Sequence, residues 1–169
     1  MQTIADMRPA DSIVVEEAPS ARPILQRHLP IDYAEGFYTM DSGGLGYGLP
    51  AAVGVALGKP GRRIVAIIGD GSSLYSIQGL WSAAQLGLPI SFVILNNGGY
   101  SALKEFAPAF GFGKQEPVQG TDLPGIDYVA LARGFGVPAK RATDAESLAQ
   151  ALAEALAANG PALVEVVVV

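Results

Sequence analysis

The stretch RIVAIIGDGSSLYSIQGLWSAAQLGLPISFVILNNGG, residues 63–99, holds two patterns of buried strands with a helix pattern between them. Residues 63–68 and 90–95 are mostly apolar and rich in β-branched side chains, and each run ends at a glycine-containing turn. Residues 73–88 carry apolar side chains three and four positions apart, which is typical of an amphipathic helix, here ending at Pro89. The stretch therefore predicts a strand, a helix and a second strand.

Polar residues follow both predicted strands. Residues 69–72 (GDGS) come after the first strand and residues 96–99 (NNGG) after the second, with 24 residues between the GDG and NN elements. A right-handed crossover makes the strands parallel and brings both loops to one sheet edge, so we expect Asp70 and Asn97 to meet. A carboxylate and an amide oxygen suit Mg²⁺, and the bare N–H groups that follow Asp70 at the helix entrance suit a phosphate. The pattern predicts a two-part site for a metal-bridged diphosphate.

The GDG and NN elements at this spacing resemble the signature of thiamine diphosphate (ThDP) enzymes, in which they hold Mg²⁺ and the cofactor's diphosphate. Within that family the chain looks most like the benzoylformate decarboxylases. This second resemblance rests on Tyr75-Ser76-Ile77, Leu80-Trp81, Ala83-Ala84-Gln85, Asn96-Asn97-Gly98, Tyr100 and Leu123-Pro124-Gly125-Ile126-Asp127. It covers nearly the whole chain and implies an α/β fold, with an open, mostly parallel sheet and helices on both faces.

The resemblance implies roles for residues around the diphosphate. Asp70, the side chain of Asn97 and the main-chain carbonyl of Gly99 would be ligands of Mg²⁺. Ser20 matches a phosphate-contacting hydroxyl, whereas Pro19 replaces a neighbouring hydroxyl residue of the family. The implied cofactor-binding set is Ser20, Gly43, Leu45, Gly69, Asp70, Gly71, Ser72, Asn97, Gly99 and Tyr100.

The resemblance also implies residues near the reacting end of the cofactor. Residues 43–46 match the family loop whose large apolar residue wedges under the cofactor and holds its two rings in a V. That residue would be Leu45, with the Gly43 carbonyl accepting a hydrogen bond from the aminopyrimidine. Leu103 and Phe106 fall where the decarboxylases line an aryl pocket. Leu45, Leu103 and Phe106 are thus the candidate catalytic-site residues, and ordinary core packing is the alternative for all three.

Two other interpretations compete for the glycine motifs. A GDG segment alone is commonly a tight turn with a solvated aspartate, but the NN loop at matching spacing favours the binding site. Residues 46–51 (GYGLPA) also fit the G-x-G-x-x-A dinucleotide pattern, with Asp70 about 20 residues further on. That pattern needs a strand leading directly into the glycines, whereas residues 41–44 intervene. A nicotinamide site is therefore the less favoured interpretation.

The composition agrees with a buried α/β domain. The chain has 169 residues, of which 50% are hydrophobic and 16% charged, so we expect one domain over residues 1–169. A net charge of −5 without a basic run argues against nucleic acid as a partner, and the lack of cysteine excludes disulfides and thiolate chemistry. No apolar stretch is long enough for a membrane span and no signal pattern begins the sequence, so a cytoplasmic protein without a membrane partner is expected.

The remaining segments predict further elements of the sheet and the surface. Residues 12–15 and 162–167 have strand patterns, and Glu16 and Glu17 follow the first of them as site or rim residues. Residues 143–146 predict a capping box for a helix that ends near residue 159. Residues 107–124 lack periodicity, which predicts a mobile loop and a candidate lid, and His28, the only histidine, is expected at the surface.

The resemblance implies decarboxylation of a 2-keto acid to an aldehyde and CO₂. In the family, a glutamate on a separate pyrimidine-binding (PYR) domain activates the cofactor, and this chain has no counterpart of that domain or of the central domain. We therefore expect a C-terminal, diphosphate-binding domain that is inactive alone, needs a PYR-type domain or subunit, and forms homo-oligomers. A small subunit of a split enzyme of the sulfopyruvate decarboxylase or acetolactate synthase kind, and a non-catalytic module, are the alternatives. An aromatic 2-keto acid follows from the likeness, although an apolar pocket suits a branched aliphatic one equally.

Overall fold

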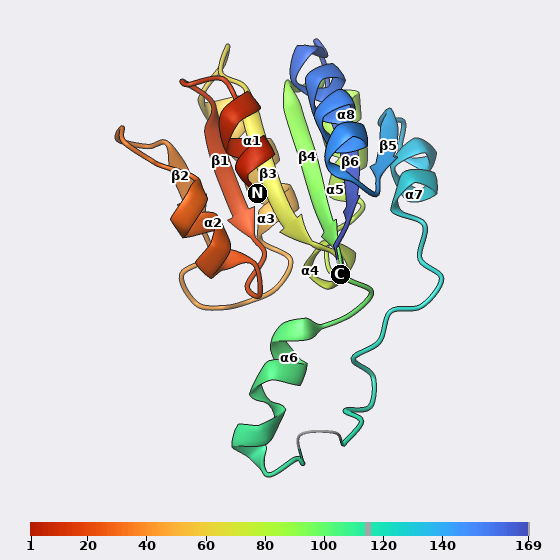
Figure 1. The fold of residues 1–169 in the computed structure, drawn as a ribbon. Helices are drawn as coiled ribbons and strands as arrows, with labels where there is room; N and C mark the ends of the chain where they lie inside the picture. Colours follow the sequence, from red (N-terminus) through yellow and green to blue (C-terminus); the bar gives the residue numbers. More distant parts are fainter. Residues whose placement is uncertain (114–115, 169) are drawn as a thin grey trace.

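A six-stranded parallel sheet forms the centre of the computed structural model, which describes residues 1–113 and 116–168 (Figure 1). The strand order is β2-β1-β3-β4-β6-β5, and every neighbouring pair is parallel. The strands are β1 (Ile13–Glu17), β2 (Phe37–Thr39), β3 (Ile64–Gly69), β4 (Ile90–Asn96), β5 (Ala139–Ala142) and β6 (Ala162–Val167). The predicted open, mostly parallel α/β sheet is confirmed, including the strands expected near residues 12–15, 63–68, 90–95 and 162–167.

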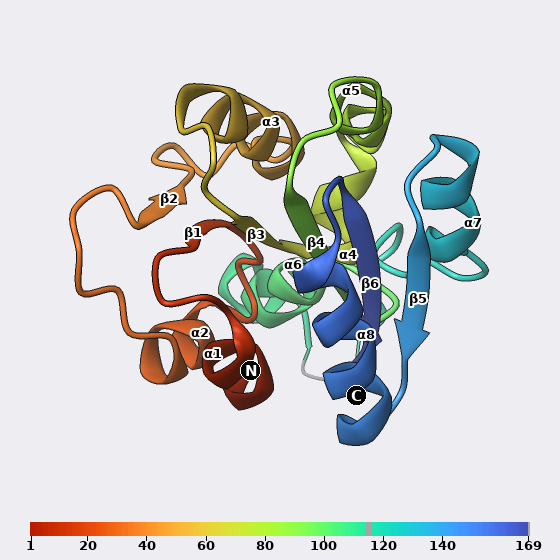
Figure 2. The same cartoon turned by 90° about the horizontal axis from the view of Figure 1, so that it is seen from above.

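Helices cover both faces of this sheet (Figure 2). One face carries α3 (Gly48–Gly58), α5 (Gly79–Gln85) and α7 (Tyr128–Gly134), and the other carries α1 (Gln2–Met7), α2 (Arg22–His28) and α8 (Ala145–Ala157). Strands β3 and β4 are buried on both faces, which explains why their sequences are continuous apolar runs rather than alternating ones. The short helices α4 (Asp70–Leu74), α6 (Ser101–Phe106) and η1 (Ala107–Phe110) lie beyond the carboxyl ends of the strands (Figure 1).

The single helix predicted over residues 73–88 is wrong, because the segment forms two short helices, α4 and α5, separated by turns. The N–H groups of Tyr75 and Ser76 donate to carbonyls three residues back instead of four, at 3.3 and 3.2 Å. The hydroxyl of Ser73 donates to the carbonyl of Asp70, at 2.7 Å. Serine side chains compete in this way with regular helical bonds, so the apolar spacing continues where the helix does not. α5 also ends before Pro89, at a turn with Gly87 in the left-handed region (φ 59°).

The capping box of α8 lies one residue later than predicted. The Asp144 carboxylate accepts from the Ser147 N–H at 2.8 Å, and the Ser147 hydroxyl accepts from the Asp144 N–H at 3.2 Å. The prediction failed because serine, rather than Glu146, supplies the reciprocal group. His28 ends α2 and its Nδ1 lies 2.9 Å from the Gln2 side-chain oxygen, which agrees with the expected surface position. In the expected lid, residues 114–115 lie outside the described residues, and its mobility stays a prediction.

Candidate cofactor site

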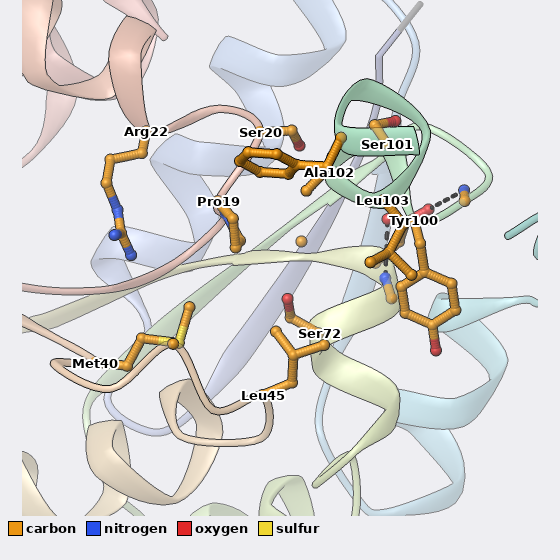
Figure 3. A pocket seen from close by; sticks show the side chains of 16 residues that line it. Pro19, Ser20, Arg22, Met40, Leu45, Ser72, Tyr100, Ser101, Ala102 and Leu103 are labelled. Carbon is orange, nitrogen blue, oxygen red and sulfur yellow. Dashed lines mark hydrogen bonds between the residues drawn. The ribbon is translucent and has the colours of Figure 1, made fainter. Parts of the chain in front are cut away.

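The largest concentration of predicted site residues lines a cavity of about 330 Å³ at the carboxyl ends of the central strands (Figure 3). The chain leaves β1 toward β2 on one side and then crosses to β3 on the other side, so β1 and β3 flank the point where the strand order reverses. In open α/β sheets this reversal opens a crevice between the loops, where ligands usually bind. Segments after β1, β2, β3 and β4 all reach the cavity.

The structure brings together most of the predicted cofactor-binding set. The lining includes Ser20, Gly43, Leu45, Gly69, Asp70, Gly71, Ser72, Gly99 and Tyr100, together with Leu103 and Phe106. Asn97 is not among the lining residues: it is exposed, and its side-chain oxygen accepts from the Gly99 N–H at 3.2 Å. Residues as far apart in the sequence as Ser20 and Phe106 thus share one cavity, because the parallel strands bring their following loops to one edge.

Asp70 is the buried acid of this cavity. Its side chain is 2% exposed, and its two carboxylate oxygens accept from the Gly71 N–H at 2.9 Å and the Gly99 N–H at 3.0 Å. Burial raises the pKa of Asp70 above its ordinary value, against the lowering effect of these main-chain donors. Asp70 makes no ion pair within residues 1–113 and 116–168. A buried carboxylate without a basic partner is a group that a cation would stabilise, so the donor set fits Mg²⁺.

Two glycines beside this carboxylate have neighbouring segments packed closely against them. A Cβ at Gly71 would lie 2.5 Å from the Tyr100 ring, and a Cβ at Gly99 would lie 2.5 Å from the Thr121 carbonyl oxygen. Gly71 and Ser72 are buried in the first turn of α4, where N–H groups lack helical partners, and that of Gly71 donates instead to the Asp70 carboxylate. Glycine at these two positions therefore lets Tyr100 and the Thr121 main chain pack directly against the loops beside Asp70.

Glu17 holds the glycine loop on the opposite wall. Its carboxylate, 1% exposed, accepts from the Gly46 N–H at 2.6 Å and also from the Gly48 N–H. Burial raises the pKa of Glu17 despite these bonds. The prediction of Glu17 as a solvated rim residue is wrong, because the residue belongs to β1 and points inward to fix the loop that carries Leu45. Its expected contact with the cofactor or a subunit partner stays a prediction. The Glu17 carboxylate occupies the N–H groups that a dinucleotide's pyrophosphate would need, which argues against the dinucleotide interpretation.

Sequence reasoning missed several lining residues, namely Arg22, Met40, Ser101 and Ala102. Arg22 is the informative one, because its Nε donates to the buried Glu16 carboxylate at 2.9 Å and its Nη2 donates to the Thr39 hydroxyl at 3.0 Å. Glu16 also accepts from Thr39, at 2.7 Å, and is buried, so it does not itself face the cavity as expected but holds the lining residue Arg22. The available signal was a basic residue in the helix that follows the Ser20 loop.

The apolar wall of the cavity comes from α6 and from the loop before α3. Leu103 and Phe106 line the cavity and remain 55% and 64% exposed. Leu45 lines it from the opposite side (Figure 3) and is half-buried. Core packing is therefore not the role of Leu103 and Phe106, because a core side chain would be covered. The cavity thus joins a polar, acidic wall at Asp70 to an apolar wall at α6.

No cluster of three or more histidine, cysteine or acidic side chains capable of holding a metal occurs among the described residues. A cation at Asp70 would therefore take its other ligands from amide or carbonyl oxygens, phosphate and water, as Mg²⁺ commonly does. In the same described part of the chain, no helix is both long and apolar enough to cross a membrane.

The fold and the cavity together define a cofactor-binding domain of the ThDP class. The chain belongs to the family described as thiamine pyrophosphate enzyme, C-terminal TPP binding domain, whose model matches residues 20–166. It is 44% identical over 95% of its length to benzoylformate decarboxylase of Pseudomonas aeruginosa, and 34% identical over 96% of its length to the acetolactate synthase large subunit of Parasynechococcus marenigrum. It spans 30% of the first relative and 26% of the second.

A solved structure agrees closely with this fold. The ThDP-dependent 4-hydroxybenzoylformate decarboxylase of Rhodococcus jostii RHA1 superposes with a TM-score of 0.92 at 41% identity. The superposition covers 97% of this chain and 31% of that one. The resemblance to benzoylformate decarboxylases expected from the sequence motifs is thereby confirmed.

Proposed function

We propose that this chain anchors the Mg²⁺ and diphosphate of ThDP within a larger 2-keto acid decarboxylase of the benzoylformate decarboxylase type. The observation that carries the proposal is the buried Asp70 carboxylate, which has main-chain donors but no basic partner among the described residues and which lines a cavity at the carboxyl ends of the strands. ThDP supplies the electron sink for loss of CO₂ when it is bound.

The residues on the polar side of the cavity would hold the metal ion and the diphosphate. Asp70, with the Gly99 carbonyl and the Asn97 amide, would hold Mg²⁺, and the Asn97 side chain would have to turn from its present contact with the Gly99 N–H. The hydroxyl groups of Ser20 and Ser72 would donate hydrogen bonds to the phosphate oxygens, and the Gly71 N–H would have to turn from its present contact with Asp70 to do the same. Gly69 and Tyr100 complete this wall of the cavity.

The apolar side of the cavity would orient the reacting end. Leu45, held by the Glu17 tether of its loop, would support the bent cofactor from below, and Gly43 would accept from the aminopyrimidine. Leu103 and Phe106 would exclude water and contact the substrate side chain. An aromatic 2-keto acid fits this wall, and the relatives whose names contain benzoylformate support that substrate class.

Joining of two keto acids, as the name acetolactate synthase denotes, is the second candidate, because a relative of that name is 34% identical over nearly the whole chain. The two candidates differ in what reacts after the loss of CO₂: a proton in decarboxylation, or a second keto acid in joining. Other domains would help to select between them. Both candidates would depend on a PYR-type domain or subunit that supplies the activating glutamate. Formation of a homo-oligomer would then complete the active site. The isolated chain is accordingly proposed to be inactive.

The proposal is tested by titrating ThDP into the purified chain with Mg²⁺ and with a chelator, by calorimetry. Binding that requires both Mg²⁺ and Asp70 is expected, so Asp70→Ala abolishes the heat. Asp6→Ala, an exposed aspartate on α1, is the matched control and keeps the wild-type affinity. Equal binding by the wild type and Asp70→Ala, or binding that ignores the chelator, would contradict the proposed site.

A further inference from the structure

A chain of polar contacts runs from the edge of the sheet to Asp70, and the proposed cofactor site leaves most of it unexplained. Glu165 on β6 is 1% exposed, although it lies in an otherwise apolar strand. Its carboxylate accepts from the Arg141 Nε at 2.8 Å and from the Asn96 side-chain nitrogen at 2.7 Å. Arg141 and Glu165 are register partners on β5 and β6, and Asn96 ends β4, so the contacts cross three adjacent strands (Figure 1).

The orientation of the Asn96 amide follows from its two partners. A carboxylate only accepts and a main-chain N–H only donates, so the nitrogen must face Glu165 and the oxygen must face the Gly98 N–H, at 3.0 Å. The next amide, that of Gly99, donates to Asp70 at 3.0 Å. Asn96 thus links Glu165 to the loop at residues 97–99, in which the Gly99 N–H is shared between Asp70 and the Asn97 side-chain oxygen, at 3.0 and 3.2 Å.

We propose that Glu165 is a positioning residue: acting through Asn96, it holds the loop at residues 97–99 in the conformation that presents Asn97 and Gly99 to the cation at Asp70. This rests on the proposed function for the role of the loop. The geometry itself does not depend on a bound cofactor. Asn96, the first residue of the NN pair, is accordingly the support of the loop and not a ligand.

Sheet stability alone does not explain a carboxylate at this position. Burying a charge costs free energy that a valine or leucine at the same place would not, and Glu165 lies directly between Val164 and Val166 on β6. The compensation comes from one partially exposed arginine and one amide. A residue that merely filled the sheet would be apolar, so the acid is explained by the contact that it makes with Asn96.

Exchanging the two groups gives a sharp test. Glu165→Gln leaves one acceptor facing two donors, Asn96 and Arg141, so one contact is lost. Asn96→Asp places two carboxylates where a bond of 2.7 Å now stands. The double variant Asn96→Asp/Glu165→Gln restores a donor opposite every acceptor, because the glutamine nitrogen donates to the new aspartate and its oxygen accepts from Arg141. The double variant also keeps the net charge of the wild type.

The measurement is amide hydrogen exchange of Gly99 in the full chain without cofactor, compared with the Val93 amide at the centre of β4. Each single variant is expected to accelerate exchange at Gly99 about tenfold more than at Val93, since hydrogen bonds to charged groups are among the stronger ones. The double variant returns the ratio to within about threefold of the wild type. Glu154→Gln, which removes an exposed acid paired with Lys140, is the control and changes neither amide.

Two outcomes would overturn the proposal. One is that the single variants accelerate amide exchange at Gly99 and Val93 equally, which would indicate a general loss of stability. The other is that the double variant does not restore the exchange ratio of the wild type. If Asn96→Asp does not fold, Glu165→Gln and the partially exposed Arg141→Gln carry the test, because both still predict selective acceleration at Gly99. A positive result here beside an absence of ThDP binding would reject the proposed function while retaining the positioning role of Glu165.

Discussion

Replacement of Gly46 by alanine is expected to destabilise the chain by about 2–3 kcal/mol, whereas the same change at Gly54 should stabilise it. Gly46 has φ 95°, in the left-handed region, where a Cβ costs about 1–2 kcal/mol. Its Cβ would also lie 3.0 Å from the Cβ of Tyr75, an atom that no side-chain rotation can move, which adds about 1 kcal/mol of overpacking. Gly54 lies within α3, and a Cβ there would meet no atom within 4 Å, so alanine gains about 0.5–1 kcal/mol of helix propensity.

Thermal and urea unfolding followed by far-UV circular dichroism measure both effects. A domain of this size shifts by about 2–4 °C per kcal/mol, so Gly46→Ala should lower the midpoint by about 4–12 °C and Gly54→Ala should raise it by about 1–4 °C. The two variants add the same methyl group, and only the surroundings differ. A Gly46→Ala midpoint within about 1 °C of the wild type, or shifts of the same sign for both variants, would refute the account of the glycine loop.

Three further predictions concern the core residue Leu80, the exposed Phe110 at the end of η1 and the buried Glu17. Leu80→Ala should lower the free energy of unfolding in urea by about 2–5 kcal/mol, because Leu80 is fully buried. Trp81→Ala, at an adjacent residue that is 55% exposed, should lower it far less, and similar losses would contradict the orientation of α5. Phe110→Ser should change the free energy of unfolding by less than about 0.5 kcal/mol, since Phe110 is 79% exposed. The same variant should reduce the proposed self-association in sedimentation, and unchanged association would show that Phe110 does not contribute to the interface between copies. Burial raises the pKa of Glu17 above its ordinary 4.5, and a carboxyl of this kind stabilises the fold most below its unfolded pKa and loses that contribution as pH rises through the folded pKa. The unfolding free energy of the wild type should therefore fall relative to that of Glu17→Gln as pH rises above 4.5 in a urea series, and a constant difference would show that Glu17 titrates normally.

The parallel sheet and the edge at which the site lies could be predicted because they depend on short-range patterns. The two central strands, β3 and β4, are almost entirely apolar runs, and a strand–helix–strand unit has one favoured hand. These two facts suffice to bring residues 69–72 and 96–99 to the same edge. The break between α4 and α5 escaped prediction because hydroxyl-to-backbone bonds, such as the one from Ser73, leave the apolar spacing unchanged.

The candidate site divides in the same way. The sequence by itself determined which loops carry the acid and the GDG and NN glycines, since these follow directly from the ends of two strands, whereas the apolar residues Leu45, Leu103 and Phe106 were implied by the family resemblance. Only the tertiary structure decided which side chains face the cavity and what holds them there. Glu17 reaches the amide of Gly46, 29 residues away, and Glu165 reaches Asn96, 69 residues away. Such contacts depend on strand order, register and the direction of each side chain at a strand end, and no local pattern contains that information.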